Sequence, residues 1–403
     1  MIRRNRHGDR YHSYDYGPDL LPEPGGELDL WRYRALLPPV PPRAAYPLRV
    51  GGTPLRPAER LRETAGLPGL WLKDETVGPS ASNKDRATAL VIEDGLASGA
   101  TVITTSSTGS AAVATAVGAA AADLGAVLFV PGACLPSKVE TMRAAGAHVF
   151  RVVDGYHAAF ELSRQVAARF GWIDRNTGSN PLTTEAKKTV ALEVWEQLGR
   201  RAPDAVLVPV GDGPTLVGLA KGFRELVACS AIPAVPRLIG VQARACAPLA
   251  DAWHGVVPGP YEPAGTAADG IAVPVPSLGG WVLDEVRHAG GGFVTVSEED
   301  IRTAMHRLDH DADVPTEPAG AAALAGARAA LDAGLLTSDE CVVALVTGAD
   351  LPPRQAARRG HEWTIRADPG AVADRISEVL PNSVSGLAAC GEPADAQKGL
   401  SAW

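Results

Sequence analysis

The chain has 403 residues, of which 46% are hydrophobic, 5% aromatic and 21% charged, as expected for a soluble globular protein of two to three domains. Its 46 Asp and Glu outnumber its 38 Lys and Arg, which gives a net charge of −8 without any basic block. Nucleic acid and anionic membranes are therefore not expected partners, and an anionic ligand would need a local binding site.

Targeting segments and covalent cross-links are not indicated by the sequence. The five cysteines are scattered and include no CxxC pair, so neither a disulfide framework nor a zinc ribbon is expected. A reducing cytoplasm is the expected location. The basic N-terminal stretch lacks the apolar segment of a signal peptide. The longest apolar stretch, Ala111–Ala122, is too short to span a bilayer and is expected to form a buried helix.

The N-terminal region divides into an arm and the start of a folded body. Residues 1–45 are polar and rich in proline, which predicts an arm that wraps the body or a partner. The alternation of apolar and polar residues in Leu70–Glu75 predicts a half-buried strand. A helix is predicted after it, with Ser82 and Asp85 forming a capping box at its start and Gly99 ending it.

Strands and helices then alternate along most of the chain. The first predicted strands are Thr101–Ser106, Ala126–Pro131 and His148–Val153, and the first predicted helices are Ser110–Leu124, Ser137–Ala145 and Tyr156–Phe170. Later strands are Ala205–Val210, 237–243 and 341–348, and later helices are Thr184–Leu198, one that ends near Cys229, Glu298–Asp309 and Ala319–Ala333. The continuous apolar run of Ala205–Val210 is typical of a central parallel strand covered on both faces.

This alternation predicts an α/β protein with two open parallel-sheet α/β domains. The expected parts are an arm, a large domain in two segments, a small inserted domain and a C-terminal extension: 1–45, 46–100 with 176–352, 101–175 and 353–403. In the extension, Asp368 and Pro369 are expected to begin one helix, as its N-cap and first residue.

The first candidate for chemistry is Lys84, in the first turn of the helix predicted after Ser82. With Ser82 as N-cap, Lys84 takes the second helical position, where the positive end of the helix disfavours an ammonium group and lowers its pKa. Schiff-base chemistry needs a lysine with a depressed pKa. A solvated lysine without a function is the alternative interpretation.

A glycine turn, Gly211–Thr215, follows the buried strand and opens a helix. It matches neither nucleotide-binding fingerprint, because Leu216 stands where GxGxxG needs its last glycine and no GxxxxGK[ST] occurs. The turn still lies at the carboxyl end of a parallel strand, where α/β proteins bind ligands. Pro214 suits the first helical position, so free N–H groups would face an anion, and Asp212 should turn its carboxylate away from any phosphate. An ordinary tight turn is the alternative.

Two further strand ends carry hydroxyl groups. Ser106–Ser110 leads from a strand into a helix, and its hydroxyl and N–H groups suit a carboxylate, with simple N-capping as the alternative. Thr347 ends the last strand and is uninformative by itself. No metal is expected, because Asp309, Asp311 and Asp313 have the opening spacing of a calcium loop but lack its glycine and its final glutamate. The absence of GxSxG leaves a serine hydrolase unsupported.

Taken together and in this order, the segments resemble the fold-type II pyridoxal-phosphate-dependent enzymes, the tryptophan synthase beta superfamily, and are most similar to its threonine synthase branch. The matching stretches cover roughly residues 30–350. They are LWRYRALLP, GGTPL, LWLKDE, SNKDRA, SSTGSAA, NP followed by TTEAKKT, VPVGDG, KGF, GVQARACAPL, ADGIAVP, EPAGAAALAG and VTG.

The resemblance implies a role for each candidate. Lys84 would be the Schiff-base lysine for pyridoxal 5'-phosphate and, once freed by the substrate, the proton carrier. Gly211–Thr215 would hold the cofactor phosphate. Ser107, Thr108 and Ser110 would hold the substrate α-carboxylate and lie near the cofactor ring. Thr347 would meet the ring nitrogen, and such a hydroxyl partner leaves that nitrogen largely unprotonated, which suits elimination and replacement more than transamination.

The sequence also departs from the family pattern. Asn83 stands where Phe usually precedes the lysine, and Ser110 stands where Asn usually supports the ring oxygen. The Arg that in threonine synthases often follows the NP segment and contacts the substrate phosphate is absent from Leu182–Thr184.

Other cations are expected to replace that arginine at the substrate. Arg86 and Lys188 are the predicted substrate-binding residues, and Lys187 is a further candidate. A solvated helix face is the alternative explanation of the two lysines.

The expected function is that of a carbon–oxygen lyase, a cytoplasmic homodimer that forms L-threonine from O-phospho-L-homoserine by elimination and water addition. The first alternative is a β-elimination or β-replacement enzyme that uses the same cofactor, either similar to serine and threonine dehydratases or a synthase of specialised amino acids. The second is a homologue that binds the cofactor without catalysis.

Overall fold

The computed structural model describes residues 16–38, 46–257, 259, 261, 263–350 and 355–383. Its strands are β1 (Leu55–Pro57), β2 (Gly69–Asp74), β3 (Val102–Ser106), β4 (Gly125–Pro131), β5 (His148–Val152), β6 (Ile173–Asp174), β7 (Ala205–Pro209), β8 (Arg237–Ala243), β9 (Gly292–Val296), β10 (Cys341–Val346) and β11 (Glu362–Ile365).

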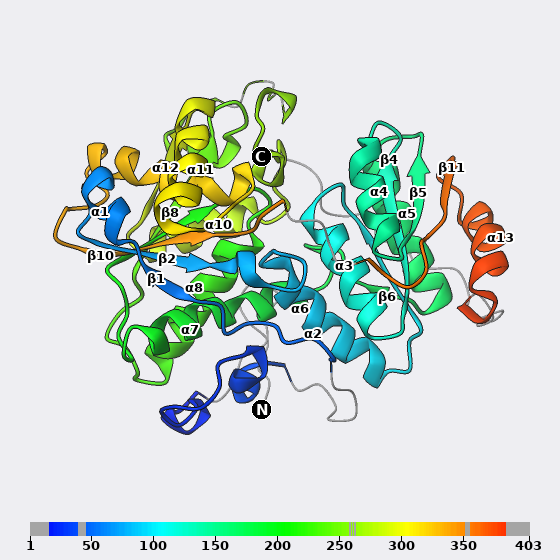
Figure 1. The fold of residues 1–403 in the computed structure, drawn as a ribbon, viewed down its shortest axis with the longest axis horizontal. Coiled ribbons are helices and arrows are strands. Elements are labelled where there is room, and N and C mark those ends of the chain that lie inside the picture. The colour runs from blue at the N-terminus through cyan, green and yellow to red at the C-terminus, as the bar shows by residue number, and fades with distance from the viewer. Residues whose placement is uncertain are drawn as a thin grey trace.

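Helices cover both faces of the sheets that these strands form (Figure 1). The α-helices are α1 (Glu59–Ala65), α2 (Lys84–Ala97), α3 (Ser110–Ala121), α4 (Pro136–Ala144), α5 (Tyr156–Phe170), α6 (Leu182–Glu185), α7 (Thr189–Gln197), α8 (Pro214–Ala228), α9 (Pro248–Trp253), α10 (Gly279–His288), α11 (Glu298–Ala312), α12 (Pro318–Asp332) and α13 (Pro369–Val379). The 3-10 helices are η1 (Pro18–Leu20), η2 (Leu30–Leu36), η3 (Glu75–Val77), η4 (Ala186–Lys188), η5 (Pro263–Gly265), η6 (Asp269–Ile271) and η7 (Pro381–Ser383).

The strands form two sheets. The six-stranded sheet has the order β1-β2-β10-β7-β8-β9, and β1 pairs antiparallel with β2 while the other pairs are parallel. The five-stranded sheet has the order β11-β5-β4-β3-β6 and is parallel throughout. The predicted α/β fold with open parallel sheets is confirmed.

The continuous apolar sequence of β7 follows from its position in the middle of the six-stranded sheet. Val206 and Val208 pack in the same core as residues of α7, α8 and α10. Ala205 and Leu207 point to the opposite face and pack with residues of α11 and α12. Because side chains alternate between the two faces of a strand, a strand covered on both faces must be apolar at every position.

The five-stranded sheet is covered in the same way. Ala126, Leu128 and Val130 of β4 share a core with residues of α2, α3 and α4. Val127 and Phe129 face the other side, where residues of α5 and α13 cover them. This second sheet therefore receives both a strand, β11, and a helix, α13, from the C-terminal segment (Figure 1).

Most predicted elements are present, with several differences. The single helix predicted over Thr184–Leu198 is divided into α6, η4 and α7. The helix predicted to begin at Asp368 and Pro369 is α13, and the Asp368 carboxylate accepts hydrogen bonds from the N–H groups of Gly370 and Ala371. The prediction missed β1, β6, β9, β11, α1, α9 and α10.

We propose the two sheets as the cores of two domains, with the boundaries given above. The large domain takes 46–100 and 176–352, and the small one takes 101–175. The proposed arm, 1–45, lies partly outside the described residues. Within its described part, Tyr33 and Leu36 of η2 pack in the core of the six-stranded sheet, and Leu30 packs in a core of the five-stranded one. Among the described residues, no helix combines the length and the apolar character needed to cross a membrane. Cys134, Cys229, Cys246 and Cys341 are unpaired, and Cys390 lies outside the described residues.

Candidate active site

A cavity of about 680 Å³ lies at the carboxyl ends of strands from both sheets. Its lining includes residues that follow β3, β7 and β10, together with Lys84 at the start of α2. Parallel strands place such loops at one edge of the sheet, which is where α/β proteins bind ligands. The predicted site residues that line it are Lys84, Ser107, Thr108, Ser110, Gly211, Asp212, Gly213, Pro214, Thr215 and Thr347.

Lys84 is held at this position by backbone contacts with the end of β10. Ser82 forms an isolated antiparallel bridge with Gly348, and the N–H group of Asn83 donates to the carbonyl oxygen of Thr347 at 2.9 Å. The Nζ of Lys84 then donates to Oδ1 of Asn83 at 2.9 Å. The segment that carries the lysine is therefore fixed to the strand that carries Thr347.

Asn83 also connects the lysine to the start of α8. Its Nδ2 donates to Oγ1 of Thr215 at 3.2 Å. The departure from the family pattern at Asn83 thus gives Lys84 a polar partner, which a phenylalanine at this position would not provide.

The capping box predicted for Ser82 and Asp85 is wrong. The helix begins at Lys84, so this lysine is the first helical residue and Asn83 is the N-cap. Ser82 Oγ accepts only a long hydrogen bond, 3.3 Å, from the Lys84 N–H group. The Asp85 carboxylate instead accepts from the N–H group and Oγ of Ser80, at 2.9 and 2.6 Å. The bridge between Ser82 and the end of β10 sets the path of the chain here.

The pKa of Lys84 is lowered, as predicted, but the main cause is burial. Removal from water disfavours the ammonium form, and the nearby Arg175 guanidinium lowers the pKa further, whereas the Glu317 carboxylate raises it. The sequence prediction attributes the lowering to the positive end of a helix and does not anticipate that the lysine is buried. A lowered pKa increases the fraction of the neutral amine, which is the nucleophilic form.

The glycine turn between β7 and α8 has a backbone that leaves no room for side chains at its two glycines. Gly213 is the N-cap of α8 and has a φ of +100°, and Pro214 is the first helical residue, as predicted. A Cβ on Gly211 would lie 2.9 Å from Cα of Ile271, and one on Gly213 would collide with Val282. Both glycines are therefore required by this backbone, and the N–H groups of the first turn of α8 are directed to the cavity end of the helix.

Asp212 lies within this turn but is held by another loop. Its two carboxylate oxygens accept hydrogen bonds from the N–H group and Oγ of Ser277, at 2.6 and 2.8 Å. This pairing fixes the acidic side chain against Ser277, in agreement with the expectation that it does not face a bound phosphate.

Glu317 is a cavity residue that the sequence argument did not single out. Ser110, the first residue of α3, donates from Oγ to Oε2 of Glu317 at 3.2 Å. Burial raises the pKa of Glu317, and the positive charge of Lys84 lowers it in part. The sequence signal that could have identified Glu317 is its position directly before Pro318, which begins a helix, within the stretch EPAGAAALAG.

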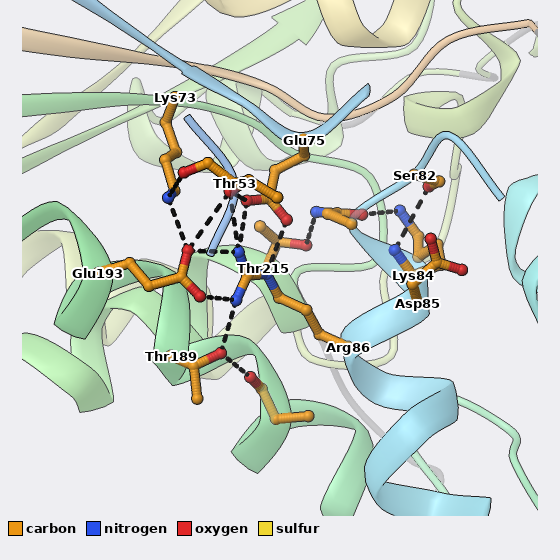
Figure 2. A network of polar contacts seen from close by, with 12 residues as sticks. Thr53, Lys73, Glu75, Ser82, Lys84, Asp85, Arg86, Thr189, Glu193 and Thr215 are labelled. Atoms are coloured by element: carbon orange, nitrogen blue, oxygen red, sulfur yellow. Dashed lines mark hydrogen bonds and ion pairs between the residues drawn. The ribbon is translucent and has the colours of Figure 1, made fainter. Parts of the chain in front are cut away.

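The structure does not bring Arg86 to the cavity, so the prediction that it contacts substrate is corrected. Its guanidinium is fully buried and binds two carboxylates, Glu75 at 2.7 Å and Glu193 at 2.5 Å. Lys73 binds the same Glu193 at 2.7 Å. Figure 2 shows these four side chains pointing toward one another, beside the segment that carries Lys84. Arg86 belongs to a closed buried network.

The prediction for Lys188 is corrected for the same reason. Its Nζ lies 2.9 Å from carboxylate oxygens of both Glu185 and Glu225, and all three side chains are buried. Lys221 binds the same two carboxylates. Lys188 is thus part of a buried ion-pair group between η4 and α8 and does not line the cavity.

Comparison with known proteins agrees with this geometry. Residues 46–348 match the family of pyridoxal-phosphate dependent enzymes. The chain belongs to this family. It is 31% identical to the threonine synthase of Methanosarcina acetivorans over 322 residues, which cover 79% of each chain. It is 30% identical to the threonine synthase of Mycobacterium tuberculosis over 347 residues, 85% of this chain and 94% of that enzyme.

Solved structures show the same fold. Threonine deaminase isoform 2 from Solanum lycopersicum superposes with a TM-score of 0.62 at 23% identity, covering 74% of this chain and 79% of that one. Diaminopropionate ammonia lyase from Escherichia coli superposes with a TM-score of 0.64 at 17% identity, covering 87% of this chain and 94% of that one.

The cavity of this pyridoxal-phosphate dependent enzyme fits the cofactor. A partly buried lysine of lowered pKa, a glycine turn at a helix start and a buried threonine hydroxyl line the same space. The lysine is suited to bind the cofactor aldehyde, the glycine turn to bind its phosphate, and the threonine hydroxyl to contact its ring nitrogen. Among the described residues, no group of three or more His, Cys, Asp or Glu side chains is placed to hold a metal ion.

Proposed function

We propose that this enzyme is a lyase of the threonine synthase type, which converts O-phospho-L-homoserine and water into L-threonine and phosphate. The relatives that are about 30% identical over most of the chain are threonine synthases, which supports the proposal. The observation that carries it is the hydrogen-bonded link from Lys84 through Asn83 to Thr215, because it joins the amine to the turn that would hold the cofactor phosphate.

The residues of the cavity divide into binding and proton-transfer groups. Gly211–Thr215 would hold the cofactor phosphate through the N–H groups at the start of α8, and Thr347 would contact the ring nitrogen. The cofactor supplies an electron sink that lets the α-proton of an amino acid leave. Ser107 and Thr108 would hold the substrate α-carboxylate at the start of α3. The amine of Lys84 would take and return protons.

A second candidate is a dehydratase or β-replacement enzyme, and one observation favours it. Thr183 occupies the segment that follows Asn180-Pro181, and its Oγ1 donates to the carbonyl oxygen of Asn180 at 2.7 Å. This side chain is buried and provides no charge for a substrate phosphate. An enzyme that acts on serine or threonine would not need such a charge.

A substrate panel separates the two candidates. The purified holoenzyme would be given O-phosphohomoserine, O-phosphoserine, serine and threonine, and phosphate, ammonia and threonine would be measured. Phosphate together with threonine supports the synthase. Ammonia from serine or threonine, without threonine formation from O-phosphohomoserine, supports the dehydratase and contradicts the synthase. Lys84→Ala is the control and is expected to abolish turnover and the visible absorbance of bound cofactor.

We further propose a cytoplasmic homodimer. The proposal is supported by the polar, proline-rich residues 1–45 and by the similarity to the family. Size-exclusion chromatography with light scattering tests the dimer, and a mass of one chain would contradict it.

A further inference from the structure

An ion pair at the cavity joins elements that belong to different sheets. Lys138, in the first turn of α4, binds the carboxylate of Asp269, the first residue of η6. Residues of α4 pack in a core of the five-stranded sheet, whereas Ile271 of η6 packs in a core of the six-stranded one. Asp269 lines the cavity, and Lys138, which is not part of the lining, contacts the cavity wall through this carboxylate. The ammonium group of Lys138 is therefore one ion pair away from the cavity.

The 3-10 helix that carries Asp269 lies between two other parts of the cavity wall. A Cβ on Gly211, in the glycine turn, would lie 2.9 Å from Cα of Ile271 and 3.0 Å from the carbonyl oxygen of Gly270. A Cβ on Gly270 would lie 3.9 Å from Oε1 of Glu317, whose carboxylate accepts the hydrogen bond from Ser110. η6 thus adjoins both the turn proposed for the cofactor phosphate and the Glu317 carboxylate that binds the start of α3, where the substrate carboxylate is proposed to lie.

The lining of the cavity is poor in positive charge. Within the described part of the chain it includes one lysine, Lys84, no arginine, and one histidine, His157. The proposed function uses Lys84 to attach the cofactor, and a histidine is charged only when it is protonated. Arg86 and Lys188 are held in buried ion pairs. A substrate phosphate would therefore find no permanent positive partner among the residues that line the cavity.

The ion pair of Lys138 differs from those of the buried cations in its exposure. The side chain of Lys138 is 33% exposed and that of Asp269 is 52% exposed. Water and salt screen such a pair, so it contributes little to stability and can open at low cost. The flexible four-carbon stem of a lysine lets its ammonium group move to another anion nearby. A phosphate monoester carries up to two negative charges and attracts an ammonium group more strongly than one carboxylate does.

We propose that Lys138 binds the phosphate group of the substrate, and that Asp269 holds this lysine when no substrate is bound. The inference rests on the proposed function, which brings a phosphorylated amino acid into the cavity. Binding exchanges one ion pair for another, because the ammonium group leaves the Asp269 carboxylate for the phosphate oxygens. The two residues therefore act on the substrate in opposite directions: Lys138 attracts the phosphate, whereas Asp269 repels it and competes for the lysine. A contact that only joined the two sheets would be lost equally when either residue was changed.

The test compares the parent holoenzyme with Lys138→Met, Asp269→Asn and the double variant. Two quantities are measured on each protein: the affinity for inorganic phosphate, by equilibrium dialysis, and the ratio of kcat/KM for O-phosphohomoserine to that for O-acetylhomoserine. The decisive comparison is between Asp269→Asn and the double variant. In that pair no carboxylate remains at position 269, so the loss on removing the lysine measures its own attraction for phosphate. Arg328→Met, which removes an exposed ion pair on α12, is the control.

The two single variants are expected to change phosphate recognition in opposite directions. Asp269→Asn should raise the affinity for inorganic phosphate and the kcat/KM ratio by roughly two- to fivefold, because the lysine is then free. Adding Lys138→Met to it should lower both by roughly tenfold or more. Lys138→Met alone should also lower both, and Arg328→Met should change neither. The affinity of the cofactor-free protein for pyridoxal phosphate should stay the same in all variants, since the cofactor phosphate is not the ligand of Lys138.

Three results would overturn the proposal. Equal values for Asp269→Asn and the double variant would limit Lys138 to neutralising Asp269. Losses of similar size in both single variants would show that the pair only joins the two sheets. A loss in His157→Gln beside a double variant that matches the parent would assign the phosphate to the histidine. Failure of the proposed function is distinguishable, because the parent would then form no threonine from O-phosphohomoserine while the phosphate affinities still report on Lys138.

Discussion

Ser110 donates a hydrogen bond to Glu317 at 3.2 Å and so joins the start of α3 to the start of α12 across the cavity. The two helices cover different sheets: α3 packs on the five-stranded sheet and α12 on the six-stranded one. This contact places a carboxylate of raised pKa where its charge also acts on Lys84. The protonation of Lys84 is therefore coupled to Glu317, a residue 233 positions away in the sequence.

Glu317→Gln is expected to shift the pH dependence of cofactor attachment to lower pH. The negative charge of Glu317 raises the pKa of Lys84, so its removal lowers that pKa further, and the neutral amine is then present at lower pH. The rate at which visible absorbance develops on adding pyridoxal phosphate to the cofactor-free protein measures this shift. Ser110→Ala, which removes the hydrogen bond but keeps the charge, is the control. An unchanged profile for Glu317→Gln would contradict the coupling.

Arg86→Met is expected to destabilise the protein without a specific effect on substrate. The change leaves Glu75 and Glu193 buried with less positive charge, and breaking a buried ion pair costs about 3–5 kcal/mol. Urea unfolding of the cofactor-free protein measures the loss. Arg328→Met removes an exposed ion pair with Asp332 and is expected to change the free energy of unfolding by less than about 1 kcal/mol. Equal losses for the two variants would show that the Arg86 network does not stabilise the fold.

The sequence was sufficient to predict the position of the cavity. Buried strands followed by small or hydroxyl residues identify the carboxyl ends of β3, β7 and β10, and parallel pairing brings those ends together. The turn Gly211–Thr215 is encoded locally, by glycine conformations and by a proline at the first helical position. Such features need no knowledge of distant contacts.

The assignment of individual cations could not be made from the sequence. Lys187 and Lys188 are neighbours in η4, yet Lys188 binds Glu185 and Glu225 whereas the Nζ of Lys187 makes no hydrogen bond to the described residues, because adjacent residues of a helix point in different directions. Arg86 is satisfied by Glu193, which is 107 positions away. The partner of a buried cation is a tertiary property, and only the folded chain shows which cation remains without one.

The strands that the sequence did not predict lack a clear local signal. β6 has two residues and β11 alternates between exposed and partly buried positions at the edge of its sheet, so neither has a strong apolar pattern. β9 begins with a glycine that follows two others, a sequence typical of a turn. In each case neighbouring strands, and not local propensity, determine the structure.

Gly213→Ala is expected to weaken binding of pyridoxal phosphate by at least about tenfold while changing pyridoxal affinity less. Gly213 has a φ of +100°, and an added Cβ would collide with Val282, so the start of α8 must move. Spectroscopic titration of the cofactor-free protein with each compound measures the two affinities. Gly255→Ala is a matched control, because Gly255 has a φ of +71° but no atom within 4 Å of an added Cβ. Equal losses for the two compounds would indicate general damage to the cavity and would contradict a role of the turn in holding phosphate.

The free energy of unfolding is expected to fall steeply as the pH is lowered from about 4.5 to about 2. Burial alone would raise the pKa of Glu193, but Arg86 and Lys73 lower it from 4.5 to about 2. A carboxylate with a depressed pKa stabilises the folded state above its ordinary pKa, and this contribution is lost as the pH falls through the folded-state value. Glu193→Gln should be less stable near neutral pH and should lose less stability over this acid range. Urea unfolding at a series of pH values measures both slopes, and Glu299→Gln, on the exposed face of α11, is the control. If Glu193→Gln kept the slope of the parent protein, other carboxylates would have to account for the acid sensitivity.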